Sequence, residues 1–497
     1  MTQDVESTLL VLRRLGIHLS LDGPSLRYRS PNGVLGAPWH AELARLKPPL
    51  SGWLTSRRQL EGDAPLPPPM PGPRTKCFRA SFAQEGVFPK RGAYGIPPNV
   101  SIAVRLTGPL KDSALEESLA RLLAQHDVLR SRFEVTEDGL FLVDAEGHLA
   151  LEFADFTNSP AQLREAQAQS LAREVSEHAF DVAREMPTRG ALIRLSRWDH
   201  VLVVVMDRLV ADARSSKIIV RDLLATYSAV LSRDPSSSAA PSLRFADFAA
   251  WERSWFRGRE REIRDRYWSI QLSDHSGQPG RAAQASRAVS GEPIRVTIPT
   301  ALLEALIRVG VKAQTTLMVM LLTAFAAAVF AYRDNTSTLI AITRDARDRI
   351  DLADTVGFLA TVDLVRIDGF DSSRLEELIA QTRRNYLESL TFAVPTVWEH
   401  LGKAHAMFNY LEDSGTGTSP GRRMEGATQL RVAPFPTAHT RAGRPLHPVH
   451  LTLTRSRTDI SGDITFQSDV VDRDAVMLIR TRFLQTVTQM SQLVTHK

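Results

Sequence analysis

The stretch Val201-Leu-Val-Val-Val-Met-Asp-Arg-Leu-Val-Ala-Asp-Ala213 decides the fold of this chain. Its unbroken run of apolar residues predicts a strand that is buried on both faces. The run ends abruptly in Asp207 and Arg208, and Asp212 follows shortly after them. Charges at the end of a buried strand mark either a functional site or a structural ion pair. The stretch therefore predicts an α/β fold with polar chemistry at the end of one inner strand.

The overall composition is that of a globular protein. The chain has 497 residues, of which 43% are hydrophobic and 24% are charged, and this length corresponds to about three domains of ~150 residues. The longest apolar stretch, residues 317–332, is shorter than the ~20 residues of a membrane span and predicts a buried helix. The N-terminus shows no secretory signal, and the single Cys77 excludes an internal disulfide. These features predict a cytoplasmic protein without a membrane segment.

The charge pattern argues against nucleic acid as a partner. The net charge is +5, but the basic residues are scattered among acidic ones and form no basic stripe. Acidic partners, such as an acidic peptide, suit this surface better. The sequence shows no metal-ligand spacing, no phosphate-binding glycine loop and no nucleophile elbow. We therefore expect no bound metal or cofactor.

Two irregular stretches divide the chain. Ala64-Pro-Leu-Pro-Pro-Pro-Met-Pro-Gly-Pro73 predicts an extended, semi-rigid tether. A second low-order stretch begins at Ser273 and separates two α/β halves of similar size. A third, residues 413–421, is interpreted as a surface loop or a crossover segment. The predicted units are residues 1–58, a linker 59–75, a first lobe 76–272, a linker 273–292 and a second lobe 293–497.

Residues 1–58 predict a small α+β unit. A helical pattern over residues 6–15 ends at Gly16, and an Asp22-Gly23 turn signal lies between two alternating segments. A second short helix is predicted over residues 39–46. This order of helix, hairpin and helix resembles the TubC-type docking domain of assembly-line synthetases.

The docking resemblance implies a partner. Such domains capture an acidic C-terminal peptide of the upstream synthase by adding it as a strand beside the hairpin. Arg27 and Arg29 alternate on one face of the second predicted strand, so they are the candidate peptide-binding residues. The alternative is that both are solvated arginines that protect an edge strand from aggregation.

Several blocks of the remaining chain resemble, in family order, the condensation domains of nonribosomal peptide synthetases. The divergent segment around Asp207 stands where that family has His-His-x-x-x-Asp-Gly. The other blocks are Ser81-Phe-Ala-Gln-Glu85, Gln125-His-Asp-Val-Leu-Arg-Ser-Arg-Phe133, Phe245-Ala-Asp-Phe-Ala-Ala-Trp251, Val356-Gly-Phe-Leu-Ala-Thr-Val-Asp-Leu-Val-Arg366 and Pro395-Thr-Val-Trp-Glu399.

The family resemblance implies an architecture and a mode of substrate delivery. It implies two chloramphenicol-acetyltransferase-like lobes set in a V, with a central tunnel between them. Substrates reach the tunnel on the phosphopantetheine arms of acyl or peptidyl carrier proteins, so the domain itself needs no cofactor. The motif's Asp is structural in the family and pairs with an arginine of the second lobe. Here Asp212 keeps that position, and Arg344 is its predicted partner.

The motif departs from the family at the catalytic position. Arg208 stands in place of the second histidine, and arginine keeps its proton, so it cannot act as a general base. It could still stabilise a developing oxyanion. Asp207 replaces the first histidine and is predicted to pair locally with Arg208 or Arg214. Ala213 adds a methyl group where the family has glycine, which also indicates altered catalysis.

The sequence leaves two functions open. In the first, the chain is a stand-alone acyltransferase that forms an amide or ester from a carrier-bound thioester, with Arg208 as an electrostatic stabiliser. In the second, it is a non-catalytic platform like the X domain of glycopeptide synthetases, which also carries arginine at the second histidine position and recruits a tailoring enzyme. We favour a domain whose catalysis is divergent or lost. The other histidines, among them His126, His178 and His450, are interpreted as incidental.

Overall fold

The computed structural model of the chain describes most of residues 69–493 and parts of the N-terminal unit. The described residues are 18–22, 25–29, 43–44, 46–48, 50–51, 69–90, 99–145, 149, 151–233, 243–273, 291–333, 337–347, 349–369, 374–412, 422–423, 430–436, 445, 447–456 and 459–493.

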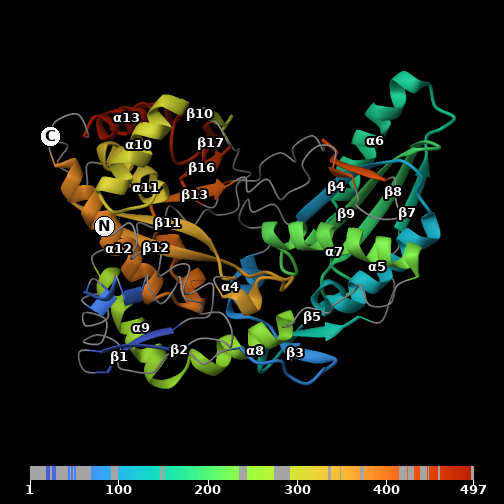
Figure 1. The fold of residues 1–497 in the computed structure, drawn as a ribbon, viewed down its shortest axis with the longest axis horizontal. Coiled ribbons are helices and arrows are strands. Elements are labelled where there is room, and N and C mark those ends of the chain that lie inside the picture. The colour runs from blue at the N-terminus through green and yellow to red at the C-terminus, as the bar shows by residue number, and fades with distance from the viewer. Residues whose placement is uncertain are drawn as a thin grey trace.

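The first lobe is built on a six-stranded sheet with the order β14-β15-β4-β9-β8-β7 (Figure 1). The predicted inner strand is β9, which pairs with β4 on one side and β8 on the other. Its apolar residues are buried, as the unbroken run predicted. The strands and associated helices are β4 (Asn99–Thr107), β7 (Leu151–Asp155), β8 (Thr188–Ser196), β9 (Asp199–Asp207), α5 (Asp112–Gln125), α6 (Ala161–Ser176) and α7 (Ala213–Ser232).

A three-stranded sheet and several short helices complete the first half of the chain. Its strand order is β3-β6-β5. The elements are β3 (Cys77–Arg79), α4 (Phe82–Val87), η1 (Phe88–Lys90), η2 (Asp127–Arg130), β5 (Ser131–Thr136), β6 (Gly139–Asp144), α8 (Phe245–Trp255) and α9 (Gly258–Gln271).

The second lobe has its own six-stranded sheet with the order β10-β17-β16-β13-β11-β12. Helix α11 covers the part of the sheet around β11 and β13, and it packs against α13, α12 and α10. The elements are β10 (Ile294–Ile298), α10 (Thr300–Lys312), α11 (Leu317–Arg333), β11 (Ser337–Asp345), η4 (Ile350–Leu352), β12 (Ala360–Asp368), α12 (Leu375–Thr391), η5 (Pro395–Glu399), η6 (Leu401–Lys403), β13 (Ala406–Glu412), β16 (Val449–Arg455), β17 (Ile460–Phe466) and α13 (Arg473–Gln492).

Elements of each half of the chain reach the other lobe. Strands β14 (Arg422–Arg423) and β15 (Arg431–Pro434) leave the second half, and β15 pairs with β4 of the first sheet. In the opposite direction, the indole of Trp268 in α9 donates to the carbonyl of Phe392 at 2.8 Å. The lobes are therefore joined by exchanged segments as well as by packing.

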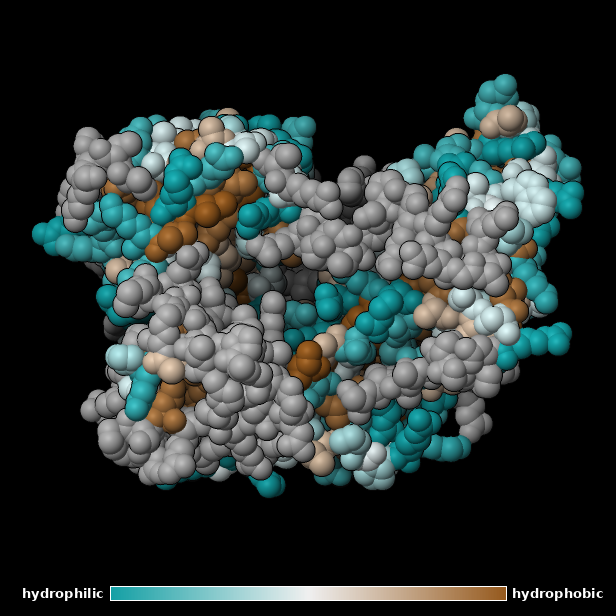
Figure 2. All heavy atoms as spheres, viewed as in Figure 1, coloured by the Kyte–Doolittle hydropathy of each residue, from teal (hydrophilic) through white to brown (hydrophobic). Residues whose placement is uncertain are grey.

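The two lobes are visible as separate masses in Figure 1, and Figure 2 shows the molecule hollowed between them. One buried core fills the first lobe and continues into the second through residues such as Leu339 and Phe358, whereas a second core lies between the second sheet and its helices. This arrangement confirms the predicted α/β fold of two lobes. The predicted limits of the lobes and linkers stay predictions.

The N-terminal unit is described only in part. Strands β1 (His18–Asp22) and β2 (Ser25–Arg29) pair antiparallel, as the Asp22-Gly23 turn signal predicted. Arg27 and Arg29 lie on β2, but their side chains are outside the described residues. The helix predicted over residues 6–15 and the Pro-rich tether over residues 64–68 are outside them as well.

The long apolar segment forms a buried helix, as predicted. Helix α11 lies in the core of the second lobe. Among the described residues no single helix is long and apolar enough to cross a membrane, and α10 and α11 meet that criterion only as a pair bent by 103°.

Candidate functional site

The charged residues that end β9 form a tight turn. The Asp207 carboxylate is buried and accepts a hydrogen bond from the Leu209 backbone N–H at 2.9 Å. The Asp207 carbonyl accepts from the Val210 N–H at 3.0 Å. Arg208 occupies the middle of this turn and is half-buried. Asp207 therefore shapes the backbone turn that presents Arg208.

Gln84, in the block Ser81-Phe-Ala-Gln-Glu85, holds this turn by a hydrogen bond from helix α4. Ser81 and Gln84 form a capping box at the start of α4, in which each side chain bonds the other's backbone. The fully buried Gln84 amide also donates to the Leu209 carbonyl at 2.7 Å. Gln84 lies in a block that resembles the family, but no role for it was predicted from the sequence. The structure shows that it anchors the loop carrying Arg208.

Asp212 starts helix α7 and is only 4% exposed. Its Oδ1 accepts hydrogen bonds from the backbone N–H and the hydroxyl of Ser215, both at 2.8 Å. Its Oδ2 accepts from the Leu359 N–H of the second lobe at 3.0 Å and from Arg347 Nη1 at 2.8 Å. The carboxylate is thus a buried structural group, as the resemblance implied.

The predicted partner of Asp212 was wrong. Arg347, not Arg344, donates to the Asp212 carboxylate. Strand alternation places Arg344 on the same face of β11 as Ile342, which belongs to the core beneath the second lobe's helices. There its Nε donates to Asp363 at 2.7 Å. Arg347 lies beyond the end of β11, where this alternation no longer sets its direction.

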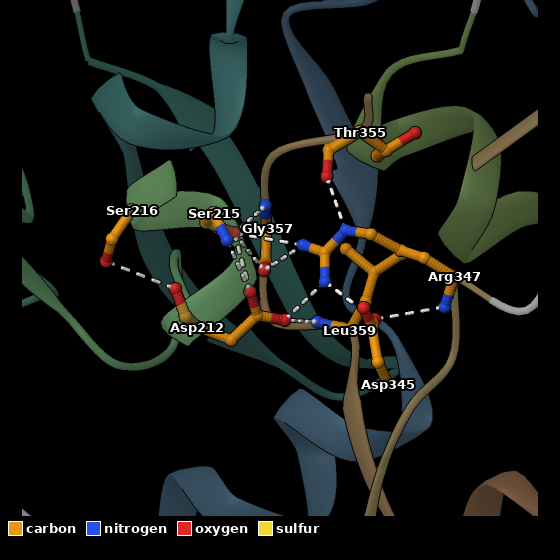
Figure 3. A network of polar contacts seen from close by, with 8 residues as sticks. All are labelled: Asp212, Ser215, Ser216, Asp345, Arg347, Thr355, Gly357 and Leu359. Carbon is orange, nitrogen blue, oxygen red and sulfur yellow. Dashed lines mark hydrogen bonds and ion pairs between the residues drawn. The ribbon is translucent and has the colours of Figure 1, made fainter. Parts of the chain in front are cut away.

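Arg347 connects four further groups to Asp212 (Figure 3). Its Nη2 donates to the Ser215 hydroxyl at 2.9 Å and to the Gly357 carbonyl at 3.2 Å. Its Nε donates to the Thr355 carbonyl and its Nη1 to Asp345, both at 2.8 Å. Every nitrogen of the guanidinium is therefore used, and the network joins the start of α7 to the second lobe.

The network depends on close backbone approach at Gly357. A Cβ atom at this position would lie 2.0 Å from the Phe245 ring of α8, so a larger residue does not fit. The Gly357 N–H also donates to the Ser215 hydroxyl at 3.1 Å. Gly357 and Phe245 each belong to a family block that sequence analysis identified, and both blocks meet at this junction.

The block Pro395-Thr-Val-Trp-Glu399 supports the same junction. Trp398 in η5 packs against Gly86 of α4, where an added Cβ would lie 2.6 Å from the Trp398 Cβ. The Trp398 ring also lies 5.8 Å from that of Phe358, centroid to centroid. Blocks distant in sequence therefore converge where the lobes meet.

Asp212 and Arg208 differ in how their surroundings shift their pKa values. Burial alone would raise the pKa of the Asp212 carboxyl, but Arg347 and the Ser215 donors outweigh it and hold that pKa below its ordinary value. Burial lowers the pKa of the Arg208 guanidinium, and the negative charges of Asp212 and Asp207 oppose this shift. Asp212 is therefore an ionised framework group, and Arg208 is a cation held near two carboxylates.

Arg208 can stabilise negative charge but cannot remove a proton at physiological pH. The negative charge of the adjacent Asp207 acts on Arg208, and the predicted pairing of Asp207 with Arg208 or Arg214 stays a prediction. Ala213 is the first residue of α7 and is exposed, so its methyl group is accommodated without a clash. The inference that Ala213 alters catalysis concerns the approach of a substrate and stays a prediction.

The histidines of the first lobe have structural surroundings. His126 is buried and its Nε2 lies 3.0 Å from Asp222. His178 lies 3.3 Å from Glu185 at the end of α6, and His200 lies 3.3 Å from Arg194 within the first sheet. Among the described residues, no three His, Cys, Asp or Glu side chains are grouped so that they could hold a metal ion.

Comparison with known proteins gives a consistent result. A sequence profile of the Condensation domain family matches residues 80–496. One of the proteins that make up the linear gramicidin synthase of Brevibacillus parabrevis is 27% identical over 365 residues, which are 71% of this chain and 5% of that protein. The enniatin synthase of Fusarium equiseti is 29% identical over 291 residues, which are 57% of this chain and 9% of that protein. The chain therefore spans a small part of the length of such curated relatives.

Solved structures show the same fold. The complex of the X-domain and OxyB from teicoplanin biosynthesis superimposes with a TM-score of 0.72 at 22% identity, covering 86% of this chain and 96% of the other. A condensation domain that mediates chain release from the enacyloxin polyketide synthase superimposes with a TM-score of 0.67 at 20% identity, covering 100% of this chain and 98% of the other.

Proposed function

Because the chain belongs to the condensation-domain family, we propose that it binds acyl chains tethered to carrier proteins of a nonribosomal peptide or polyketide assembly line. We further propose that it does so without the general base of active members. One observation carries the second proposal: Arg208, at the position of the second motif histidine, keeps its proton and cannot accept another. Removal of a positioned base costs ~10² to 10⁴ in rate.

The intact framework around Arg208 supports a binding role. Gln84, Asp212 and Arg347 hold the turn and the start of α7 as tightly as a functional site requires. The polar network also joins the two lobes, so the backbone that presents Arg208 is held in one position for a bound acyl chain. The substrates come on the phosphopantetheine arms of the carrier proteins, so the chain supplies no cofactor of its own.

The platform form of this function has support from the fold. The X-domain that resembles this chain was solved in complex with OxyB. By analogy, this chain would hold a carrier-bound intermediate while a tailoring enzyme acts on it. Residues 1–58 would attach the platform to the acidic C-terminal peptide of an upstream synthase, with Arg27 and Arg29 beside the added strand.

A second candidate is an active acyltransferase. The chain-release condensation domain covers the whole of this chain in the structural comparison, which favours this alternative. In that case the two tethered or bound substrates would be brought together by the domain, and Arg208 would stabilise the oxyanion. Amide or ester would form as the acceptor displaces the carrier thiol.

Intact-protein mass spectrometry of an acyl-loaded carrier protein tests these functions. The carrier is incubated with the chain or with Arg208→Ala, Arg208→His or no chain, together with amines and alcohols. The platform proposal predicts that the carrier binds but keeps its acyl group with both the chain and Arg208→Ala. Acyl transfer that needs the chain and collapses in Arg208→Ala would instead establish the acyltransferase.

Charge reversal tests the docking proposal separately. Arg27→Glu/Arg29→Glu is expected to abolish binding of an acidic C-terminal peptide, while the control Arg57→Glu/Arg58→Glu retains it. Equal peptide binding by both double variants would overturn the assignment of the peptide to the second strand.

A further inference from the structure

The start of helix α8 lies where the two lobes meet. It contacts the second lobe, because the Phe245 ring packs against Gly357 and the Leu243 carbonyl accepts from the Thr355 hydroxyl at 3.1 Å. In Figure 1 the helix lies at the lower edge of the molecule, between the lobes. A segment that is bound by the first turn of α8 is therefore held beside the lobe junction.

This turn binds the end of the Pro-rich tether. The Gly72 N–H donates to Asp247 Oδ1 at 2.8 Å. Arg244 Nη2 donates to the Gly72 carbonyl at 2.9 Å and to the Pro73 carbonyl at 3.2 Å. Both backbone groups of Gly72 are thus bound by side chains at the start of α8, although residues 70–76 are themselves exposed.

Arg244 and Asp247, which we call the anchor, hold each other in place. Their side chains are 14% and 2% exposed, and Arg244 Nη2 lies 3.0 Å from Asp247 Oδ1. Asp247 Oδ2 also accepts from the Arg244 backbone N–H at 2.8 Å. Because these bonds already fix both side chains, the anchor loses little conformational entropy when it binds the tether.

The sequence of the tether suits this anchor. Proline has no backbone N–H, so within residues 67–73 only Met70 and Gly72 can donate a backbone hydrogen bond. A Cβ atom at Gly72 would lie 3.3 Å from Asp247 Oδ1, which is a tight contact. Gly72 therefore combines the donor that the anchor needs with the absence of a side chain.

Further along α8, a second pair of charged residues holds the chain that follows the tether. The buried Glu252 carboxylate accepts from the Phe82 N–H at 2.8 Å. Arg253 Nε donates to the Ala80 carbonyl at 3.0 Å. This segment carries Gln84, which holds the turn at the end of β9. Helix α8 therefore binds the chain both before and after β3, so a pull on the tether is taken up before it reaches that turn.

We propose that the anchor is a binding site for the end of the Pro-rich tether and that it keeps the N-terminal unit beside the lobe junction. With Gly72 bound, the part of the predicted linker that can extend freely is residues 59–68, which reach about 30 Å at ~3 Å per residue. Without the anchor, residues 59–75 would reach about 50 Å. For a docked upstream synthase, which rests on the proposed function, the same limit would apply.

Limited proteolysis of the full chain with trypsin tests the anchor. Cleavage after Arg74, which is exposed and two residues from Gly72, requires this stretch to leave α8. Gly72→Pro removes the N–H that binds Asp247 and leaves α8 unchanged. Met70→Pro is the matched control, because Met70 lies in the same Pro-rich run and is 70% exposed. Mass spectrometry identifies the bond that is cleaved.

We expect cleavage after Arg74 to be about ten-fold faster in Gly72→Pro, the effect of one lost hydrogen bond to a carboxylate. The rate should be unchanged in Met70→Pro. Arg244→Met, which removes the bonds to both tether carbonyls, should accelerate cleavage as well. Rates in Gly72→Pro and Arg244→Met equal to that of the unchanged chain would overturn the anchor. An equal rise in Met70→Pro would overturn it too, since the added proline would then be the cause.

Double electron–electron resonance tests the position of the N-terminal unit. Nitroxide labels are placed at Ser25→Cys on β2 and at Ile350→Cys, which is 48% exposed in the second lobe. The chains also carry Cys77→Ser, which removes the single native cysteine. The distance distribution should be broader in Gly72→Pro than in Met70→Pro, and equal widths would overturn the limit on the N-terminal unit. Neither measurement uses a peptide or a carrier protein, so a failure of the docking proposal is distinguishable from a failure of the anchor.

Discussion

Replacing Arg347 by methionine should destabilise the chain more than removal of any exposed ion pair. The change removes the guanidinium donors of Arg347 and leaves the Asp212 carboxylate, which is 4% exposed, without its hydrogen-bonded cation. Breaking a buried pair in this way costs about 3–5 kcal/mol of unfolding free energy. Urea unfolding at pH 7 measures the loss. The double variant Asp212→Asn/Arg347→Met should recover part of it, because the uncompensated charge is gone.

A matched control uses the same two lobes. Arg221 of α7 pairs with Asp354 of the second lobe at 2.5 Å, but both side chains are 54% exposed. Such an exposed pair contributes about 0.2–1 kcal/mol. Asp354→Asn breaks it and keeps the bond of Arg221 to Asp222, so this change should have a small effect. If Arg347→Met cost no more than Asp354→Asn, burial of the Asp212–Arg347 pair would not be the reason for its importance.

Three further predictions concern buried positions in the two lobes. Burial raises the pKa of Glu252 to about 7, so the free energy of unfolding falls as pH rises from about 4.5 to 7. Urea unfolding should therefore show that Glu252→Gln is more stable than the unchanged chain by up to about 3 kcal/mol at pH 8, with little difference at pH 4.5. Burial, with a contribution from His450, lowers the pKa of His447 to about 3. The free energy of unfolding therefore falls as pH drops below 6.5. Between pH 7.5 and 5, this fall should be about 2 kcal/mol smaller in His447→Gln than in the unchanged chain. Gly86→Ala should lower the free energy of unfolding by about 1–3 kcal/mol because the added Cβ meets Trp398. Gly402→Ala should be neutral because an added Cβ there has no atom within 4 Å. Equal thermal stability of the two variants would contradict the close packing of Gly86.

Much of the fold followed from local patterns. The unbroken apolar run before Asp207 predicted an inner strand because only a strand flanked by two others and covered on both faces can bury every side chain. The Asp22-Gly23 signal predicted the hairpin of β1 and β2 because these residues favour tight turns. The apolar segment of residues 317–332 predicted a buried helix, which is α11. In each case a pattern within a short stretch of sequence predicted the local structure of that same stretch.

The site was predictable only where a residue's role is local. Asp212 caps the helix that starts immediately after it, and Arg208 itself cannot act as a general base whatever surrounds it. Gln84 lay in a quoted block, and a Ser-x-x-Gln pattern is a recognisable capping box. Its second bond, to a carbonyl 125 residues away, leaves no trace in the local pattern.

By itself, the sequence determined the two-lobed α/β family fold and the buried strand β9, and it predicted that Arg208 stands where the family has a histidine. The tertiary structure alone decided that Arg347 rather than Arg344 binds Asp212, 135 residues away. Alternation fixes the face of a strand on which a side chain lies, but not which lobe approaches that face. The approach is set by packing over the whole junction, including Gly357 against Phe245 and Gly86 against Trp398. Long-range polar partners are therefore chosen by the placement of whole elements, which the local sequence does not encode.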